Sequence, residues 1–237
     1  MPNPTQTMSE TTASGLQENV PSPLERARRH SLQSASEHLA SIDHDWAALV
    51  SLVGECTHLP KPAREPYEAL IRAIAYQQLH AKAGDAILTK FMALYGDAGF
   101  PSPKLILETE FDSLRSCGFS GRKIETIRSI AEGSESGLVP SRVLADGMSD
   151  EELISRLVAV KGIGRWTVEM LLIYTLERMD VLPVDDFGVR DGYRRLKFLP
   201  KALSPKQMGI EGLAWSPFRT IAAWYLWRVP RGESTKG

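Results

Sequence analysis

The sequence predicts an all-α fold. From Trp46 onward, apolar residues recur at the three- and four-residue spacing of helices that bury one face, and no segment alternates like a half-buried strand. Serine, aspartate, proline and glycine recur where such helices begin and end. The chain has 237 residues, 43% hydrophobic and 24% charged, which is enough for one or two soluble globular domains.

Composition also excludes several classes of protein. No stretch approaches the roughly 18 apolar residues that a membrane helix needs, and the N-terminus lacks a signal pattern, so we expect a cytoplasmic protein. Two distant cysteines, Cys56 and Cys117, exclude a four-cysteine cluster, and the five histidines contain no zinc-binding His-Glu-x-x-His pair. The net charge of −1 argues against a uniformly basic surface but leaves a local one open.

Residues 1–42 are predicted to form a disordered tail. They are rich in Ser, Thr, Glu, Pro and Asn, and such segments bury too little apolar surface to fold. We interpret the basic run over residues 26–29 as a solvated charge cluster.

Helical periodicity begins at Asp45, and prolines and glycines divide the remainder of the chain into separate helices. Ser149 and Glu152 form a capping box, which predicts that a helix opens there. The predicted helices are one from Asp45, one or two over 67–95, then 103–109, 111–116, 122–132, one after Ser149, 165–177, one from about 186, and 216–228.

A tight turn, Lys161-Gly162-Ile163-Gly164-Arg165, lies between two of these helices. Its glycines allow positive φ and close backbone approach. Unpaired N–H groups at the start of the next helix suit a phosphate oxygen and would position DNA without reading its sequence. From these residues alone, a plain helix–helix turn is the stronger interpretation. A dinucleotide-binding fingerprint would need a glycine where Thr167 stands.

Taken together, the stretch 157–167 and the sequence Val184-Asp185-Asp186 one helix later resemble the helix-hairpin-helix DNA glycosylase superfamily. Residues 67–80 resemble the helix and minor-groove loop of its alkylation-repair branch, the 3-methyladenine DNA glycosylase II type. Two more pieces agree with that branch: Gly118, Lys123 and Ile127 resemble the start of one of its helices, and residues 215–219 through 224–227 resemble its C-terminal helix. The resemblance spans about residues 46–230 in the expected order.

The resemblance implies two helical subdomains that flank an active-site cleft. We therefore expect one glycosylase unit over 43–230. One subdomain would cover about 75–185, with the helix-hairpin-helix at 149–177, and the other would combine 43–74 with 186–230. The four cysteines of the iron–sulfur cluster found in another branch are not in this sequence, so we expect no cofactor.

The resemblance further implies that Asp186 is the catalytic residue and that Asp185 is structural. An ionised carboxylate at a helix N-terminus can stabilise the oxocarbenium-like sugar and orient a water. From the residues alone, an Asp-Asp pair before a helix is more simply an N-cap. Relatives that also cut the strand carry a lysine nucleophile where this chain has Trp166, so base excision without strand cleavage is implied.

A base pocket of Trp166, Trp227 and Tyr76 is also implied, because aromatic faces stack on a flipped base and attract electron-poor alkylated bases. Core packing explains Trp227 equally well, and Tyr174 is a weaker candidate for the pocket. The implied DNA contacts are Gln77, Gln78, Leu79 and His80 in the minor-groove loop, and Gly162, Ile163, Gly164, Arg165 and Thr167 in the hairpin.

One residue of the minor-groove loop is expected to fill the gap that a flipped base leaves. The sequence does not determine whether Gln77, Gln78 or Leu79 does so. The resemblance also implies that the backbone carbonyls of Val158, Val160 and Ile163 hold a monovalent cation, Na⁺ or K⁺.

We therefore expect a monomeric, monofunctional DNA glycosylase that removes 3-methyladenine- and 7-methylguanine-type bases from double-stranded DNA in base excision repair. We expect no membrane association, and a nucleoid-associated location in a bacterium. Two alternatives stay open. One is a noncatalytic helix-hairpin-helix DNA-binding protein, which needs the glycines but not Asp186. The other is a glycosylase of the same fold with other substrates, such as ethenoadenine or mismatched bases.

Overall fold

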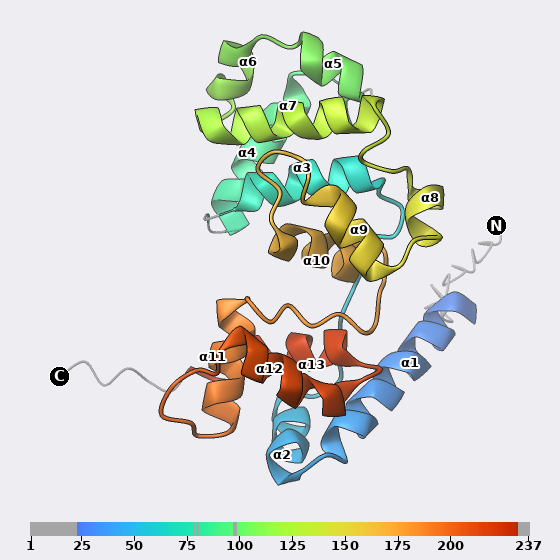
Figure 1. Cartoon of the computed structure of the whole chain (residues 1–237), viewed down its shortest axis with the longest axis vertical. Coiled ribbons are helices and arrows are strands. Elements are labelled where there is room, and N and C mark those ends of the chain that lie inside the picture. The colour runs from blue at the N-terminus through green and yellow to red at the C-terminus, as the bar shows by residue number, and fades with distance from the viewer. Residues whose placement is uncertain (1–22, 78, 80, 97–98, 232–237) are drawn as a thin grey trace, which may run out of the picture.

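The computed structural model describes residues 23–77, 79, 81–96 and 99–231. These residues form thirteen α-helices and one short 3-10 helix and include no strand, as expected (Figure 1). In chain order the elements are α1 (Pro23–Ala40), α2 (His44–Val53), α3 (Pro66–Tyr76), α4 (Ala81–Ala93), α5 (Pro103–Glu108), α6 (Phe111–Ser116), α7 (Gly121–Glu135), α8 (Arg142–Asp146), α9 (Asp150–Leu157), α10 (Arg165–Tyr174), α11 (Phe187–Leu196), α12 (Pro205–Glu211), η1 (Gly212–Trp215) and α13 (Arg219–Leu226).

The helices form two groups, each around its own apolar core (Figure 1). The first group comprises α3 to α10 and buries, among others, Ile71 and Ile127. The second comprises α1, α2, α11, α12 and α13 and buries Trp46 and Tyr225. Trp227, directly after α13, packs against both cores and lies at their junction.

The position of α3 corrects the predicted subdomain boundary. We expected residues 43–74 in the second subdomain, but Leu70, Ile71 and Ile74 of α3 are buried in the first core. Their apolar face packs against α7 and α10, so the chain crosses between the groups in the segment 54–65. It crosses back between Val181, in the first core, and Leu182, in the second.

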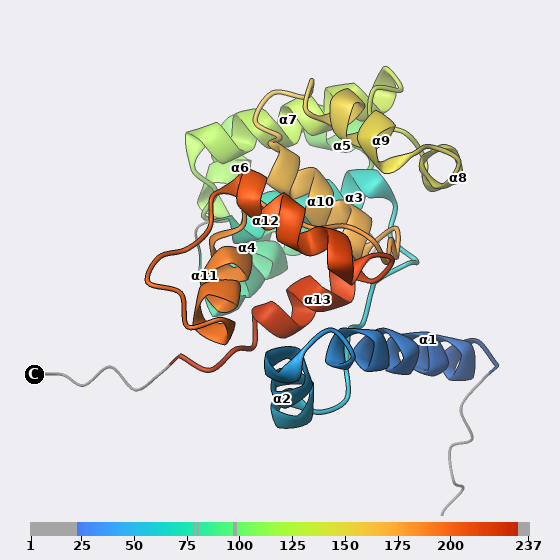
Figure 2. The same ribbon diagram turned by 60° about the horizontal axis from the view of Figure 1, so that its bottom comes forward.

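Helix α1 corrects the prediction of a disordered tail for the residues that are described. Leu32, Ala35 and Leu39 are buried in the second core, where α1 packs along α2 and against α13 (Figure 2). Ser36 Oγ also lies 2.9 Å from the hydroxyl of Tyr225. The sequence of α1 is polar, so its ordering depends on docking against another apolar surface rather than on local propensity. Residues 1–22 lie outside the described part of the chain.

Two further helices, α8 and α12, of 5 and 7 residues, were not predicted. Helix α10 ends at Tyr174 rather than near residue 177, since the chain turns there and Glu177 adopts a φ of +55°. The capping box is confirmed at the start of α9, where Ser149 and Glu152 bond reciprocally.

The crossing segment 54–65 is hydrogen-bonded to the first group. The amide of Lys61 donates to the carbonyl of Tyr174 at 2.6 Å. The Arg142 guanidinium donates to the carbonyls of Pro62 at 2.6 Å and Thr175 at 2.8 Å. Among the described helices, none has the length and apolar character needed to traverse a bilayer.

Candidate active site

The hairpin connects α9 to α10 at one face of the first group. Gly162 adopts a φ of +89°, which favours glycine, and a Cβ there would lie only 2.0 Å from Thr126 Oγ1 on α7. Gly164 is the N-cap of α10 and has no side-chain cap. Within the described residues, no acceptor is found for the amides of Gly164, Arg165 and Trp166. These exposed N–H groups form an anion-binding geometry.

The cationic side chains of the hairpin are already matched by carboxylates. Lys161 Nζ lies 3.0 Å from Glu125 Oε2. Arg165 pairs with Glu151 at 2.6 Å and with Glu169 at 3.0 Å. Burial raises the pKa of Glu169, while the hydrogen bond from Arg165 acts in the opposite direction. The hairpin therefore presents backbone donors rather than free positive charges.

Asp186 is the N-cap of α11 and accepts three hydrogen bonds. The amide of Val189 donates to Oδ1 at 2.8 Å, and the indole Nε1 of Trp227 donates to the same oxygen at 2.9 Å. The indole Nε1 of Trp166 donates to Oδ2 at 2.7 Å. Three residues predicted for one site, from α10, α11 and the end of α13, therefore meet at this carboxylate.

The neighbouring Asp185 is exposed, and its side chain accepts no hydrogen bond from the described residues. The sequence analysis missed Gly188, which is essential to the packing of Asp186. A Cβ at Gly188 would lie 2.8 Å from Trp227 Cδ1 and 3.0 Å from Asp186 Oδ1. A glycine in the first turn of α11 was the signal that could have identified this close approach.

Tyr174 joins the aromatic site, although the sequence favoured it less than Trp166 and Trp227. Its ring is stacked with Trp227 at 6.4 Å between centroids and an interplanar angle of 19°. His58, from the crossing segment, contacts the Tyr174 ring at 5.3 Å between centroids. Burial raises the pKa of the Tyr174 phenol. Its spacing of i, i+4, i+8 with Trp166 and Met170 on α10 was the available signal.

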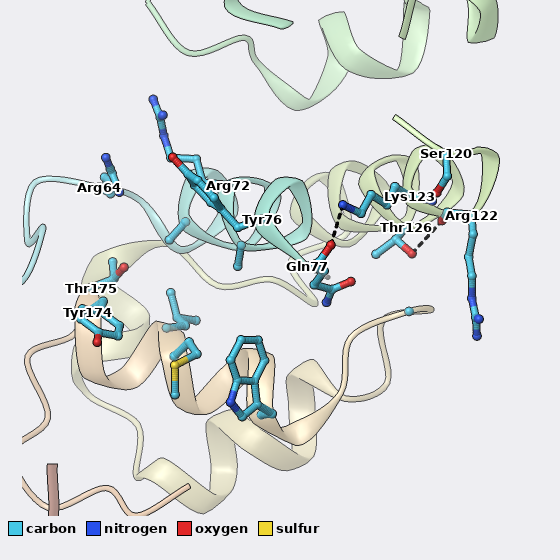
Figure 3. A pocket seen from close by; sticks show the side chains of 16 residues that line it. Arg64, Arg72, Tyr76, Gln77, Ser120, Arg122, Lys123, Thr126, Tyr174 and Thr175 are labelled. Atoms are coloured by element: carbon cyan, nitrogen blue, oxygen red, sulfur yellow. Dashed lines mark hydrogen bonds between the residues drawn. The ribbon is translucent and has the colours of Figure 1, made fainter. Parts of the chain in front are cut away.

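A cavity of about 790 Å³ lies between α3, α7 and α10 (Figure 3). Its lining is formed by Arg64, Ala69, Arg72, Ala73, Tyr76, Gln77, Ser120, Arg122, Lys123, Thr126, Gly162, Trp166, Met170, Leu171, Tyr174 and Thr175. Asp186 and Trp227 are not in this lining. Trp166 and Tyr174 line the cavity and also contact those two residues, so they join the cavity to the carboxylate.

Tyr76 lines the cavity at the end of α3 and is partly exposed. Its hydroxyl donates to Asp85 of α4, and that hydrogen bond raises the pKa of the phenol. The ring lies over Gly84, where a Cβ would come within 2.2 Å of it. Tyr76 thus shares the cavity with Trp166 but has no described contact with Asp186.

The loop after α3 is held from two sides. Lys123 Nζ donates to the carbonyls of Ala75 at 3.0 Å and Gln77 at 2.9 Å (Figure 3). Gln77 Nε2 donates to Thr167 Oγ1 at 3.3 Å. Leu79 is exposed, as a residue that inserts into a groove must be. Gln78 and His80 lie outside the described residues.

Thr167 lies differently from the prediction that it contacts DNA. Its side chain is 3% exposed, because it faces inward and accepts the hydrogen bond of Gln77. Ile163 is likewise buried. These two residues support the hairpin from inside, whereas Gly162, Gly164 and Arg165 are exposed.

The three carbonyls implied as cation ligands lie in the turn after α9. The carbonyl of Val160 accepts the amide of Ile163 at 3.0 Å, and no described donor reaches the carbonyls of Val158 or Ile163. Carbonyl oxygens can bind Na⁺ or K⁺, and two of the three implied ligands, the carbonyls of Val158 and Ile163, are free of described donors. Among the described residues, no group of three or more His, Cys, Asp or Glu side chains is arranged to hold a metal.

The sequence and the fold of this chain match those of known DNA repair proteins. Residues 71–219 match the model of the HhH-GPD superfamily of base excision DNA repair proteins. Over 202 residues the chain is 48% identical to DNA-3-methyladenine glycosylase 1 of Schizosaccharomyces pombe, covering 85% of this chain and 89% of that protein.

Two solved structures are similar over most of the chain. One is the 3-methyladenine DNA glycosylase of the same yeast in complex with abasic DNA, with 48% identity and a TM-score of 0.76, covering 82% of this chain and 95% of that one. The other is a DNA-3-methyladenine glycosidase from Bacillus halodurans, with 33% identity and a TM-score of 0.71, covering 82% and 88%.

Proposed function

This chain belongs to the HhH-GPD superfamily of base excision DNA repair proteins, and from that premise we propose that it is a monofunctional DNA glycosylase acting on alkylated purines. The substrates would be 3-methyladenine- and 7-methylguanine-type bases in duplex DNA. The observation that carries the proposal is the Asp186 carboxylate, which two indoles and a backbone amide hold at the junction of the two helix groups.

The chemistry follows from that carboxylate. When an N-glycosidic bond breaks, positive charge develops on the sugar ring, and a fixed negative charge stabilises it without reorganisation. The three donors fix both oxygens of Asp186, so the carboxylate is oriented before the substrate arrives. A water that attacks the sugar completes the hydrolysis, and the released base leaves an abasic site.

The aromatic residues support base recognition. Trp166 and Tyr174 present partly exposed rings, and Trp227 stacks behind Tyr174. Stacking on such faces favours bases that alkylation has made electron-poor or cationic. The names of the S. pombe and B. halodurans relatives specify 3-methyladenine, which supports the same substrate class. Trp166 also occupies the place of a lysine nucleophile, which supports hydrolysis without strand cleavage.

DNA would be held at two places on the first helix group. The free amides of residues 164–166 suit a phosphate, and the exposed Leu79 belongs to the loop assigned to the minor groove. A monovalent cation on the carbonyls of Val158, Val160 and Ile163 would add positive charge near that phosphate. We propose that the protein acts as a monomer, in the cytoplasm or on the nucleoid of a bacterium.

The test is a base-release assay on duplex DNA containing 3-methyladenine or 7-methylguanine. We expect Asp186→Asn to lower the single-turnover rate by about a hundredfold or more, because the developing charge loses its counter-ion. The matched control is Asp185→Asn, which neutralises the adjacent exposed carboxylate and is expected to retain most activity. The wild type should release free base and leave abasic DNA intact.

Three outcomes would contradict the proposal. Unchanged release by Asp186→Asn removes the catalytic assignment. Strand cleavage, or a covalent complex trapped by borohydride, contradicts the monofunctional reaction. A wild-type protein that binds duplex DNA and releases no base from any alkylated or mismatched substrate would be a noncatalytic DNA-binding protein.

A further inference from the structure

The charges around the hairpin are distributed differently from what its basic sequence indicates. Lys161 and Arg165 are the basic residues of the hairpin, yet both lie within ion-pair distance of carboxylates. Arg165 is held twice, by Glu151 and by the buried Glu169. A phosphate would therefore compete with these carboxylates for either cation.

The cavity beside the hairpin is lined by four cations, and three of them are also engaged. Arg72 and Arg64 share Glu68, at 2.7 Å and 3.7 Å. Lys123 donates to two backbone carbonyls. Within the described residues, Arg122 has no side-chain hydrogen bond and no ion pair, and it is exposed. Figure 3 shows its side chain extending away from the other labelled residues.

Arg122 lies on α7 beside residues that contact the two segments assigned to DNA. It is the second residue of α7, next to Lys123, which holds the loop that begins at Gln77. Four residues further on, Thr126 bonds back to the Arg122 carbonyl and packs against Gly162 of the hairpin. Residues four apart lie on one helix face, so Arg122 is on the side of α7 that meets the hairpin.

We propose that Arg122 binds a phosphate of the DNA backbone and that Lys161 and Arg165 stay with their carboxylates when DNA is bound. An unpaired guanidinium binds a phosphate without losing another partner, and it can do so through two parallel hydrogen bonds. A cation that is already paired with a carboxylate gains little net free energy by binding a phosphate. This inference rests on the proposed DNA binding. It assigns the main phosphate-binding side chain to α7 rather than to the hairpin.

The test is the salt dependence of binding to an undamaged duplex, measured by fluorescence anisotropy with the full chain. Each phosphate that a cation neutralises contributes about 0.9 to the slope of log K against log [NaCl]. We expect Arg122→Gln to weaken binding and to reduce the magnitude of the slope by about 0.9. Lys161→Gln and Arg165→Gln should change it by less than half as much.

The matched control is Arg115→Gln. Arg115 is exposed on α6, has no ion pair among the described residues and does not line the cavity, so its slope should equal that of the wild type. Thermal melting of each variant checks that it is folded. Because Arg122 is exposed, its substitution should leave the melting temperature unchanged. An unchanged slope for Arg122→Gln, or a larger loss for Lys161→Gln or Arg165→Gln, would overturn the inference.

A second variant tests whether the ion pair with Glu125 keeps Lys161 from binding a phosphate. Glu125→Gln should free this lysine and increase the magnitude of the slope by up to about 0.9, and adding Lys161→Gln should remove that increase. No increase in Glu125→Gln would show that Glu125 does not withhold Lys161 from phosphate. Because binding to undamaged DNA requires no base release, these results are separate from the Asp186→Asn assay. A wild type that does not bind duplex DNA would contradict the proposed function itself.

Discussion

At the scale of single residues, two of the three glycines at the site determine how closely the backbone and side chains approach one another. Gly162 allows the hairpin to lie against Thr126 of α7, and Gly188 leaves room for Trp227 beside Asp186. Gly164 differs, because a Cβ there would meet nothing within 4 Å. The two hairpin glycines therefore have different roles, although they look equivalent in the sequence.

We predict that Gly162→Ala destabilises the protein by about 2–3 kcal/mol, because the new Cβ would clash with Thr126 and the φ of +89° is unfavourable for alanine. Urea denaturation measures the change in the free energy of unfolding. The matched control, Gly164→Ala, should cost less than about 1 kcal/mol. Adding Thr126→Ala to Gly162→Ala should recover part of the loss, and equal effects of the two glycine variants would contradict this explanation.

At the scale of elements, α7 organises the site although it contributes no catalytic group. Its first turn supplies Arg122 and Lys123, and Thr126 one turn later contacts the hairpin. Lys123 donates to the carbonyls of Ala75 and Gln77 at the C-terminal end of α3, which accept no other hydrogen bond from the described residues. Burial lowers the pKa of its amine, while these two carbonyls remain within hydrogen-bond distance. The loop after α3 is thereby fixed relative to α10.

We predict that Lys123→Met lowers the free energy of unfolding by about 2 kcal/mol, because two carbonyls lose a charged donor. Under conditions where the variant is fully folded, base release should also fall, since the minor-groove loop is no longer held. Urea denaturation and single-turnover release measure the two effects. Lys90→Met, at an exposed lysine of α4, is the control and should leave both unchanged. Full stability in Lys123→Met would refute the anchoring role.

At the scale of the whole molecule, the site depends on the way two helix groups meet. Trp227 packs against both cores and donates to Asp186, while Tyr174 stacks on it from the first group. Behind Tyr174 lies His58, buried at 5% exposure in the crossing segment. Helix α1 covers this region and forms an ion pair between Arg28 and Glu177. Stability of the junction is therefore linked to the ionisation of His58.

Burial lowers the pKa of His58, and Arg228 and Arg28 lower it further, while a backbone hydrogen bond with Ile173 and the charge of Glu177 act in the opposite direction. In the unfolded chain the pKa returns to about 6.5. Above that pH, His58 is neutral in both states and the free energy of unfolding has its full value. The free energy of unfolding then decreases as pH falls from about 6.5 toward the folded pKa, because only the unfolded state takes up the proton.

We predict that the free energy of unfolding of the wild type declines between pH 7.5 and 5.5 more steeply than that of His58→Gln, as measured by urea denaturation across that range. The control is His44→Gln, at an exposed residue of α2, whose pH dependence should follow the wild type. Parallel curves for the wild type and His58→Gln would show that His58 does not cause the decline.

Several features followed from the sequence alone, because they depend on local patterns. Helical periodicity predicted the all-α class and most of the helices, and the Ser149–Glu152 capping box marked the start of α9. The resemblance carried by the hairpin, Trp166 and Asp186 identified the family, which the family model and the close relatives confirm. Trp166, Trp227 and Asp186 were expected to lie together, because the resemblance implies that all three belong to one active site.

Other features were decided only by tertiary structure. Helix α1 is polar and depends on docking, so its sequence resembled a disordered tail. Thr167 faces inward and Gly188 packs against Trp227, contacts that depend on segments up to 90 residues away. The same holds for the hairpin charges. The sequence determined that Lys161 and Arg165 are basic, but only the fold brought Glu125 and Glu151 to them and left Arg122 unpaired among the described residues, because ion pairing depends on distance in space rather than along the chain.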